Sequence, residues 1–472
     1  MVFSSTLFLF IYLPLVLLIY YITPLKWRNV VLFVFSLFFY GWGEPVYVFL
    51  MMAMVALDYV FGRLIEKNRA KQDDSLSMKR AKVWLLTSIV INIGTLFLFK
   101  YLDFVIENLR QIPAFSGLPT LNLVMPIGIS FYTFQKMSYV IDVYRGDSHA
   151  QKNYIKFGTY VTMFPQLIAG PIVKYKDVDG QLSERRYTVD RFADGVTIFV
   201  AGLAKKVLLA NGIGMLWDTY QAAGIEHMSV MGAWLAAAAF SFQIYFDFSG
   251  YSDMAVGLGK MLGFEFMQNF NYPYIADSVT DFWRRWHISL STWFREYLYI
   301  PLGGNRKGKW RNVLNLLIVW VVTGIWHGAA WNFLLWGLYY AVLLIVEKLW
   351  LLKAMERWPK WCRHFYTLAI VIVGWAIFAC DSLRTCATMI GNMFGVRGTG
   401  MMHVEDLYYL SCYAVLLLIS CIASLPFVKR LYAGLPSKLQ QVLTPLLLVL
   451  GLILSTAVIV DSTYNPFLYF RF

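Results

Sequence analysis

The chain has 472 residues, of which 59% are hydrophobic and 15% are charged, and its formal net charge is +13. Soluble globular proteins carry about 25% charged residues, so this composition excludes an ordinary soluble domain. Membrane proteins concentrate lysine and arginine in cytoplasmic loops, and we attribute the positive excess to that bias. Nucleic acid is therefore not expected as a partner.

Long uncharged blocks recur along the chain, at residues 7–22, 83–99, 313–346 and 442–460. Roughly 20 apolar residues in a helix cross the hydrocarbon, and lipid admits only helices or closed barrels. The blocks are continuous rather than alternating, which favours helices. We predict an all-α polytopic membrane protein with roughly 11–13 transmembrane or re-entrant helices, folded as one membrane-embedded domain over residues 1–472. Block 7–22 is expected to be the first span rather than a cleaved signal, because no positive charge precedes it.

Two basic stretches set the expected topology. Residues 63–82 carry Arg63, Lys67, Arg69, Lys71, Lys79, Arg80 and Lys82, and residues 281–312 form a longer polar and aromatic stretch that is also basic. Both should face the cytoplasm, with the N-terminus outside. We expect 63–82 to be a loop between two spans, and the longer polar stretch 264–312 to form amphipathic helices at the cytoplasmic face or partly in the membrane. The five cysteines show neither a CxxC motif nor a metal-ligand spacing, so we expect neither a disulfide framework nor a metal site.

The sequence contains six histidines. Four lie in or beside polar loops, and the other two, His287 and His327, lie in motifs that indicate a function. His327 lies in the segment Thr323–Gly328, between two uncharged runs and next to glycines. An ionisable group at membrane depth is costly and is a functional candidate by default. Desolvation favours the neutral imidazole, which can act as a general base on a hydroxyl. A core histidine bonded to a backbone carbonyl explains this residue alone equally well.

The second histidine, His287, lies in the run Asp281–Ser291. Read as one helix, this run places Trp283, Trp286 and Leu290 on one face and Arg284, His287 and Ser291 on a neighbouring face. An interfacial belt of tryptophan and arginine explains part of this pattern, but not the His-Ile-Ser-Leu-Ser sequence that follows.

Further charges lie near these motifs. Arg295 and the basic cluster at 306–311 could hold the phosphates of a nucleotide-like donor such as coenzyme A. For the cluster at 306–311 we favour the other explanation, which is the enrichment of lysine and arginine in cytoplasmic loops. Asp247 and Asp253 lie between apolar runs and need partners. We expect them to pair with arginines of 284–295 or to cap a helix that begins near Ser252, in a structural role.

The run DFWRRWHISLSTWFREYLYIPLGGN at 281–305, followed by GIWHG at 324–328, resembles the membrane-bound O-acyltransferase family. The resemblance is closest to the bacterial branch that acetylates alginate and other polysaccharides. The stretches QLIAGPIV at 166–173, FDFSGYSDMAVGLG at 246–259 and the ending NPFLYF at 465–470 are also similar to that branch.

The resemblance implies a helical fold around a central tunnel, with a cytosolic acyl thioester on one side and an acceptor hydroxyl on the other. It assigns catalysis to His327 and places His287 in the same site. We expect substrate contacts from seven further residues: Arg284, Arg285, Trp283, Trp286, Ser291, Trp326 and Asn332. The donor would be acetyl-CoA or another acyl thioester, with no bound cofactor. The partners would be membrane lipid, a polysaccharide acceptor and a periplasmic or extracellular hydrolase-like acetyltransferase, and the location the inner (plasma) membrane.

Two alternatives differ from this hypothesis. One stays within the family and transfers D-alanine to teichoic acid from a carrier-protein thioester. The other is a polysaccharide or small-molecule transporter, for which the acidic pair Asp247 and Asp253 is the one supporting feature, because inverted repeats are not evident in the sequence.

Overall fold

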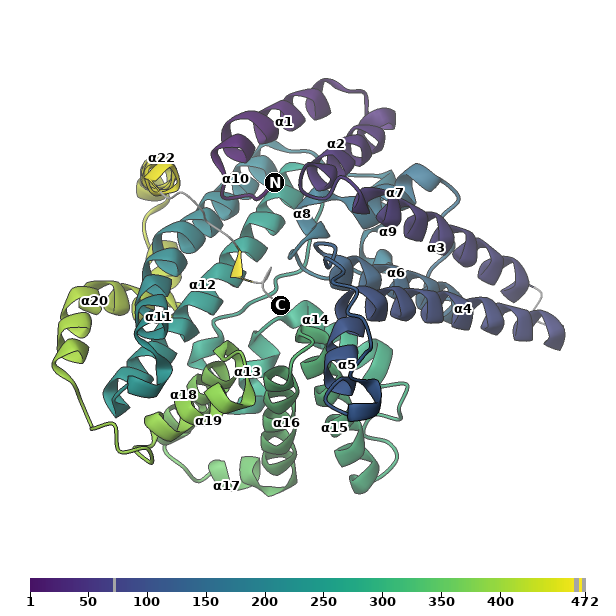
Figure 1. The fold of residues 1–472 in the computed structure, drawn as a ribbon. Helices are drawn as coiled ribbons and strands as arrows, with labels where there is room; N and C mark the ends of the chain where they lie inside the picture. Colours follow the sequence, from purple (N-terminus) through teal and green to yellow (C-terminus); the bar gives the residue numbers. More distant parts are fainter. Residues whose placement is uncertain (71–73, 462–466, 469–472) are drawn as a thin grey trace. The chain divides into compact units, whose positions relative to one another are not determined.

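The computed structural model describes residues 1–70, 74–461 and 467–468. All regular secondary structure in these residues is helical, which confirms the predicted all-α class (Figure 1). The chain divides into two compact units, Met1–Phe199 with Met254–Met267, and Val200–Asp253 with Gln268–Phe472. A single domain over residues 1–472 remains a prediction. Of the ending at 465–470, only Phe467 and Leu468 lie within the described residues.

The first unit holds the helices of the N-terminal part of the chain. They are α1 (Leu13–Ile22), α2 (Arg28–Gly43), α3 (Tyr47–Arg69), α4 (Ser75–Lys100), α5 (Leu102–Leu109), α6 (Ile129–Arg145), α7 (Tyr154–Thr162), α8 (Phe164–Leu167), α9 (Tyr175–Ser183) and most of α10 (Val189–Ala204). The loop predicted at 63–82 is mostly helical instead. Its residues end α3 and begin α4, two helices that pack side by side (Figure 1).

The second unit begins with α11 (Asn211–Ala223) and most of α12 (Val230–Met261). Next come two short helices, α13 (Val279–Arg285) and α14 (Ile288–Phe294), and then the pair α15 (Lys309–His327) and α16 (Trp331–Val346). The remaining helices are α17 (Leu352–Met355), α18 (Lys360–Ala379), α19 (Leu383–Met393), α20 (Val404–Ala423), α21 (Phe427–Ala433) and α22 (Ser437–Asp461).

Seven helical segments of the described chain are long and apolar enough to cross a membrane. They are Tyr47–Arg69, Ser75–Lys100, Val189–Ala223, Trp331–Met355, Lys360–Ala379, Val404–Ala423 and Ser437–Asp461. The first hydrophobic block forms a shorter apolar helix, Phe8–Ile22. These segments agree with the predicted polytopic membrane protein. Other blocks form helices that are shorter or interrupted, as expected from their glycines and prolines.

The carboxylates of Asp247 and Asp253 have different partners from those predicted. Both lie inside α12 rather than at its start, and they pair with two consecutive lysines of a π-helical segment, Lys205–Ala210. Lys205 Nζ lies 2.6 Å from Asp253 Oδ2, and Lys206 forms an ion pair with Asp247. The predicted pairing with arginines and the predicted cap are therefore wrong, while the structural role agrees with these pairs.

Glycines bring α15 and α16 into backbone contact. A Cβ atom on Gly324 would lie 2.5 Å from the carbonyl oxygen of Phe333, and one on Gly337 would lie 2.5 Å from that of Trp320. Real Cβ atoms do not approach backbone oxygen so closely, so only glycine fits at both positions without moving a helix. Small residues serve this purpose at many membrane helix interfaces.

We therefore expect Gly337→Ala to lower the stability of the protein by about 1–3 kcal/mol, the usual cost of overpacking. Gly94→Ala in α4 is the matched control, because a Cβ there meets nothing within 4 Å. Thermal unfolding in detergent measures both. Equal stability of the two variants would contradict the close packing described above.

Candidate active site

The two histidine motifs meet in the second unit, but not on one continuous helix. The run that contains His287 breaks between α13 and α14, and His287 itself adopts a left-handed conformation with φ of 45°. The predicted single helix with Trp283, Trp286 and Leu290 on one face is therefore wrong. A left-handed backbone at a residue other than glycine costs on the order of 1–3 kcal/mol and persists only where the surroundings hold it.

Asn269 holds this turn. Its side-chain oxygen Oδ1 accepts hydrogen bonds from the Ser289 backbone N–H at 3.1 Å and from the Ser289 hydroxyl at 2.9 Å. Its backbone oxygen accepts the Ile288 N–H at 2.9 Å. His287 Nδ1 lies 3.1 Å from the same Oδ1.

The tautomer of His287 follows from these bonds. The backbone N–H of Ser289 can only donate, so it identifies the Asn269 atom as the oxygen, and His287 Nδ1 must then donate as well. Burial lowers the pKa of His287 to about 3. The imidazole is therefore neutral at physiological pH and keeps its basic lone pair on Nε2.

His327 is the last residue of α15 and is almost fully buried. Its ring is surrounded by aromatic rings, with centroids at 4.9 Å for Trp336, 5.0 Å for Trp326 and 5.4 Å for Phe378. Trp336 packs on the imidazole almost perpendicularly, at 85°. The prediction that glycines around His327 permit close approach is confirmed, since Gly324 contacts α16 directly.

Both histidines line one cavity of about 230 Å³. The described residues of its wall come from α13, the turn at Trp286 and His287, α14, the π-helical segment Arg295–Tyr299, α15 and α16. They are Thr280, Trp283, Arg284, Trp286, His287, Leu290, Ser291, Phe294, Arg295, Tyr299, Leu316, Val319, Trp320, Thr323, His327 and Leu344. Arg284 and Arg295 are exposed, whereas most of the other side chains are apolar or aromatic. The cavity thus combines two imidazoles, a largely apolar wall and two exposed guanidinium groups, those of Arg284 and Arg295.

Three of the predicted substrate contacts do not line this cavity. The guanidinium Nε of Arg285 donates to Asp281 Oδ2 at 2.8 Å. Trp326 packs against both histidines, and its ring centroid lies 6.3 Å from that of His287. The side chain of Asn332 is buried and donates to the backbone oxygen of Phe378 at 3.4 Å. The structure therefore gives each of these three side chains another contact and does not place them on the cavity wall.

Sequence reasoning missed Asn269 and Glu347. The buried carboxylate of Glu347 accepts the backbone N–H groups of Val279 and Thr280, each at 2.8 Å, and the Thr280 hydroxyl at 2.7 Å. It thereby caps α13, the helix that carries Trp283 and Arg284. Each of the two residues is distant in sequence from the element that it stabilises. The sequence marks them only as polar residues beside apolar runs, which does not identify their partners.

Comparison with known proteins identifies the fold that carries this site. A family model described as the membrane-bound O-acyltransferase family matches residues 147–390, which include both histidines. The chain belongs to the membrane-bound O-acyltransferase family. It is therefore an O-acyltransferase, and the family named from the sequence motifs is confirmed.

Relatives within the family have different named activities. "Probable alginate O-acetylase AlgI" of Pseudomonas putida is 38% identical over 493 residues, which cover 100% of both chains. "Peptidoglycan O-acetyltransferase" of Helicobacter pylori is 32% identical and covers 86% of this chain and 82% of its own. "Teichoic acid D-alanyltransferase" of Bacillus subtilis is 32% identical over a shorter region, 54% of this chain and 67% of its own.

The hydrogen bond from His287 to Asn269 predicts a specific pH effect in this O-acyltransferase. Asn269→Asp places an anion beside Nδ1–H and raises the pKa of His287, by about one to three units for a close opposite charge. If turnover needs the neutral imidazole, the acidic limb of the profile of kcat/KM against pH moves to higher pH.

Asn269→Ala is the control for this prediction. It removes the orienting oxygen without adding charge, so activity should fall with little displacement of the acidic limb. An unchanged limb in a folded, active Asn269→Asp variant would show that the protonation of His287 does not limit turnover.

Proposed function

We propose that this protein takes an acyl group, acetyl in the first instance, from a cytosolic thioester and passes it across the membrane for O-acetylation of a polysaccharide such as alginate. One observation carries the proposal: a hydrophobic cavity that brings the histidines of two separate motifs together in an O-acyltransferase chain. The full-length similarity to a protein named as an alginate O-acetylase supports the choice of acceptor.

The proposed chemistry uses groups of this chain. His327 removes the proton from the acceptor hydroxyl, and the resulting oxygen attacks the thioester carbonyl. The tetrahedral intermediate collapses, the carbon–sulfur bond breaks, and the proton on His327 passes to the leaving thiolate. His287, with its fixed tautomer, accepts a hydrogen bond at Nε2 from a second hydroxyl of the acceptor and so orients the acceptor beside His327.

Trp283 is our candidate for the oxyanion donor. It lines the cavity, and its buried indole N–H has no hydrogen-bond partner among the described residues. A donor aimed at the developing negative charge is worth about 10²–10³ in rate in comparable sites. Arg284 is a second candidate, whereas Asn332 is less suited because its side chain bonds to Phe378 and does not line the cavity.

The cavity chemistry favours acetyl over D-alanyl. A D-alanyl thioester carries a free ammonium group, which needs an acceptor or a carboxylate at close range. The described residues that line the cavity include Arg284 and Arg295 but no aspartate or glutamate. A neutral acetyl group avoids both the repulsion and the missing counter-charge. The transporter alternative loses its support, because Asp247 and Asp253 are paired with lysines.

We further propose acetyl-CoA as the donor, a hydrolase-like acetyltransferase outside the cytoplasm as the partner, and the inner (plasma) membrane as the location. The basic stretches at 63–82 and 281–312 would face the cytoplasm and the N-terminus the outside, in accordance with the positive-inside rule. Purified protein in lipid nanodiscs, supplied with labelled acetyl-CoA and alginate oligomers with and without the partner, tests where the label goes.

His327→Ala should abolish acyl transfer while the protein still inserts and folds. Loss of a general base costs about 10²–10⁴ in rate, or ~3–5 kcal/mol of barrier. A neutral imidazole contributes only a hydrogen bond or two to stability, about 0.5–1.5 kcal/mol each. Transfer per folded molecule and thermal stability, measured on the same preparation, separate the two effects.

His149→Ala is the control for general histidine loss, because that side chain is 98% exposed in the first unit. His287→Ala should give an intermediate rate, since we assign it to orientation rather than to proton transfer. Substantial transfer by folded His327→Ala protein would refute the mechanism, irrespective of family.

Arg284 and Arg285 should differ although they are neighbours. Arg284 lines the cavity and is exposed, whereas Arg285 is held by Asp281. We expect Arg284→Gln to raise the KM for the thioester by about three- to tenfold, the value of one charged contact at a partly exposed site. Arg285→Gln should change KM by less than about twofold. Equal effects on donor affinity would mean that this basic face serves topology alone.

A further inference from the structure

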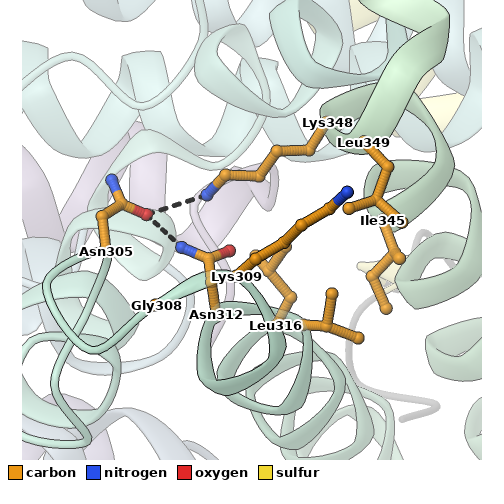
Figure 2. Close-up of a pocket in the computed structure, with 9 residues that line it drawn as sticks. Asn305, Gly308, Lys309, Asn312, Leu316, Ile345, Lys348 and Leu349 are labelled. Atoms are coloured by element: carbon orange, nitrogen blue, oxygen red, sulfur yellow. Dashed lines mark hydrogen bonds between the residues drawn. The ribbon is translucent and has the colours of Figure 1, made fainter.

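A second cavity, of about 390 Å³, lies between the start of α15 and the segment that follows α16. Figure 2 shows Lys348 and Asn312 directed toward the side chain of Asn305, with Lys309 lying between Asn312 and Leu349. The substrate hypothesis does not use any of these residues. Of the basic cluster at 306–311, for which topology is the favoured explanation, Lys309 lines this cavity.

The polar end of this pocket is ordered. Asn305 Oδ1 accepts hydrogen bonds from Lys348 Nζ at 2.9 Å, from the Tyr299 hydroxyl at 2.6 Å and from the Asn312 amide. The three donors fix the amide of Asn305 and hold Lys348 at the pocket wall. The side chain of Lys348 thus donates to two neutral acceptors, the oxygens of Asn305 and Tyr299.

The charge of the pocket is not compensated. Within the part of the chain that the structure describes, neither Lys309 nor Lys348 forms an ion pair, and the same holds for Arg306, Lys307 and Arg311 nearby. The N-cap residue of α15, Gly308, provides no side-chain cap, so the N–H groups of the first turn add partial positive charge at the same wall. A concave surface with this balance attracts an anion.

The remainder of the pocket is aliphatic, lined by Val313, Leu316, Ile345 and Leu349. The tryptophans next to the two lysines are strongly exposed, Trp310 at 81% and Trp350 at 59%. Exposed tryptophan beside lysine is typical of the membrane–water interface. The ligand that suits this pocket therefore joins an anionic group to an apolar or extended stem.

The pocket also continues toward the histidines. Leu316 lines both cavities, and Tyr299 lines the histidine cavity while its hydroxyl bonds to Asn305 and Asn312. Along α15, the residues of this pocket precede Val319, Thr323 and His327 on the same face at helical spacing. A stem that leaves the lysines along α15 reaches the wall of the histidine cavity.

We propose that this pocket binds a phosphate ester, with the phosphate held by Lys309 and Lys348 and the stem lying against the aliphatic side of α15. Two sources share that chemistry: an anionic phospholipid of the surrounding membrane, and the phosphate-bearing part of a phosphopantetheine thioester. The second source rests on the proposed function, whereas the first does not.

The experiment compares two variants of the full-length protein in nanodiscs. In one, Lys309→Gln and Lys348→Gln remove the two pocket charges. In the control, Arg306→Gln and Lys307→Gln remove two charges from the same cluster, at positions that do not line the pocket. Lys309→Gln alone replaces the pair if the double variant does not insert, because no described hydrogen bond of Lys309 is lost.

Two probes are measured directly, without need of turnover. Coenzyme A binding is titrated in phosphatidylcholine nanodiscs, and retention of phosphatidylglycerol is quantified by mass spectrometry after extraction from mixed lipid. We expect the pocket variant to lose at least about tenfold affinity for one of the probes, with the control within about twofold of the parent protein.

The outcomes distinguish the sources and the alternatives. Loss of coenzyme A binding alone identifies the donor phosphate, and loss of phosphatidylglycerol alone identifies lipid. Equal behaviour of the pocket and control variants toward both probes overturns the proposal and leaves only positive-inside topology. If wild-type protein binds either probe through the pocket but never turns over a thioester, the proposed function fails while this site stands.

Discussion

The backbone contact between α15 and α16 is the constraint on which the rest of the site depends. It forms where Gly324 meets Gly337, and its consequences extend in both directions along the pair. Toward the end of α15 it places His327 against Trp336 of α16. Beyond the end of α16 it leads to Glu347, whose carboxylate caps α13 and so holds the helix that carries Trp283 and Arg284. One helix pair thus positions three walls of the cavity.

The second constraint acts on His287 and is local. A left-handed residue that is not glycine is strained, and the strain of about 1–3 kcal/mol must be offset by bonds that no other conformation makes. Asn269 supplies them, since its side-chain and backbone oxygens bind three consecutive residues, His287, Ile288 and Ser289. The same hydrogen bonds to Asn269 stabilise the strained backbone of His287 and fix its tautomer. The turn that is costly for folding therefore also orients the imidazole.

The sequence was informative where a rare residue type sits in an unusual setting. The burial of His327 and the close helix contact at Gly324 could be predicted from the sequence. A histidine between two uncharged runs, with glycines beside it, is exceptional at membrane depth. The break at His287 could not be predicted, since Trp-Arg-Arg-Trp spacing suits a continuous helix and nothing local encodes the left-handed turn. Its cause, Asn269, lies 18 residues earlier and acts only after folding. Likewise, nothing local in the sequence predicts the π-helical segment from which consecutive lysines, Lys205 and Lys206, pair with two carboxylates of α12.

The two histidines differ in their helical position, and this difference bears on which one can carry a proton. His327 ends a helix of 19 residues, where the partial negative charge of the macrodipole stabilises an imidazolium by about 0.3–1 kcal/mol, and more when partly buried. His287 stands at the N-cap of α14, where the dipole has the opposite sign and a cation is disfavoured. Its orienting partner, Asn269, is neutral, so it fixes the ring without the charge stabilisation that an aspartate would add. In the mechanism we propose, a transient proton is therefore better held on His327, while His287 remains neutral and accepts a hydrogen bond.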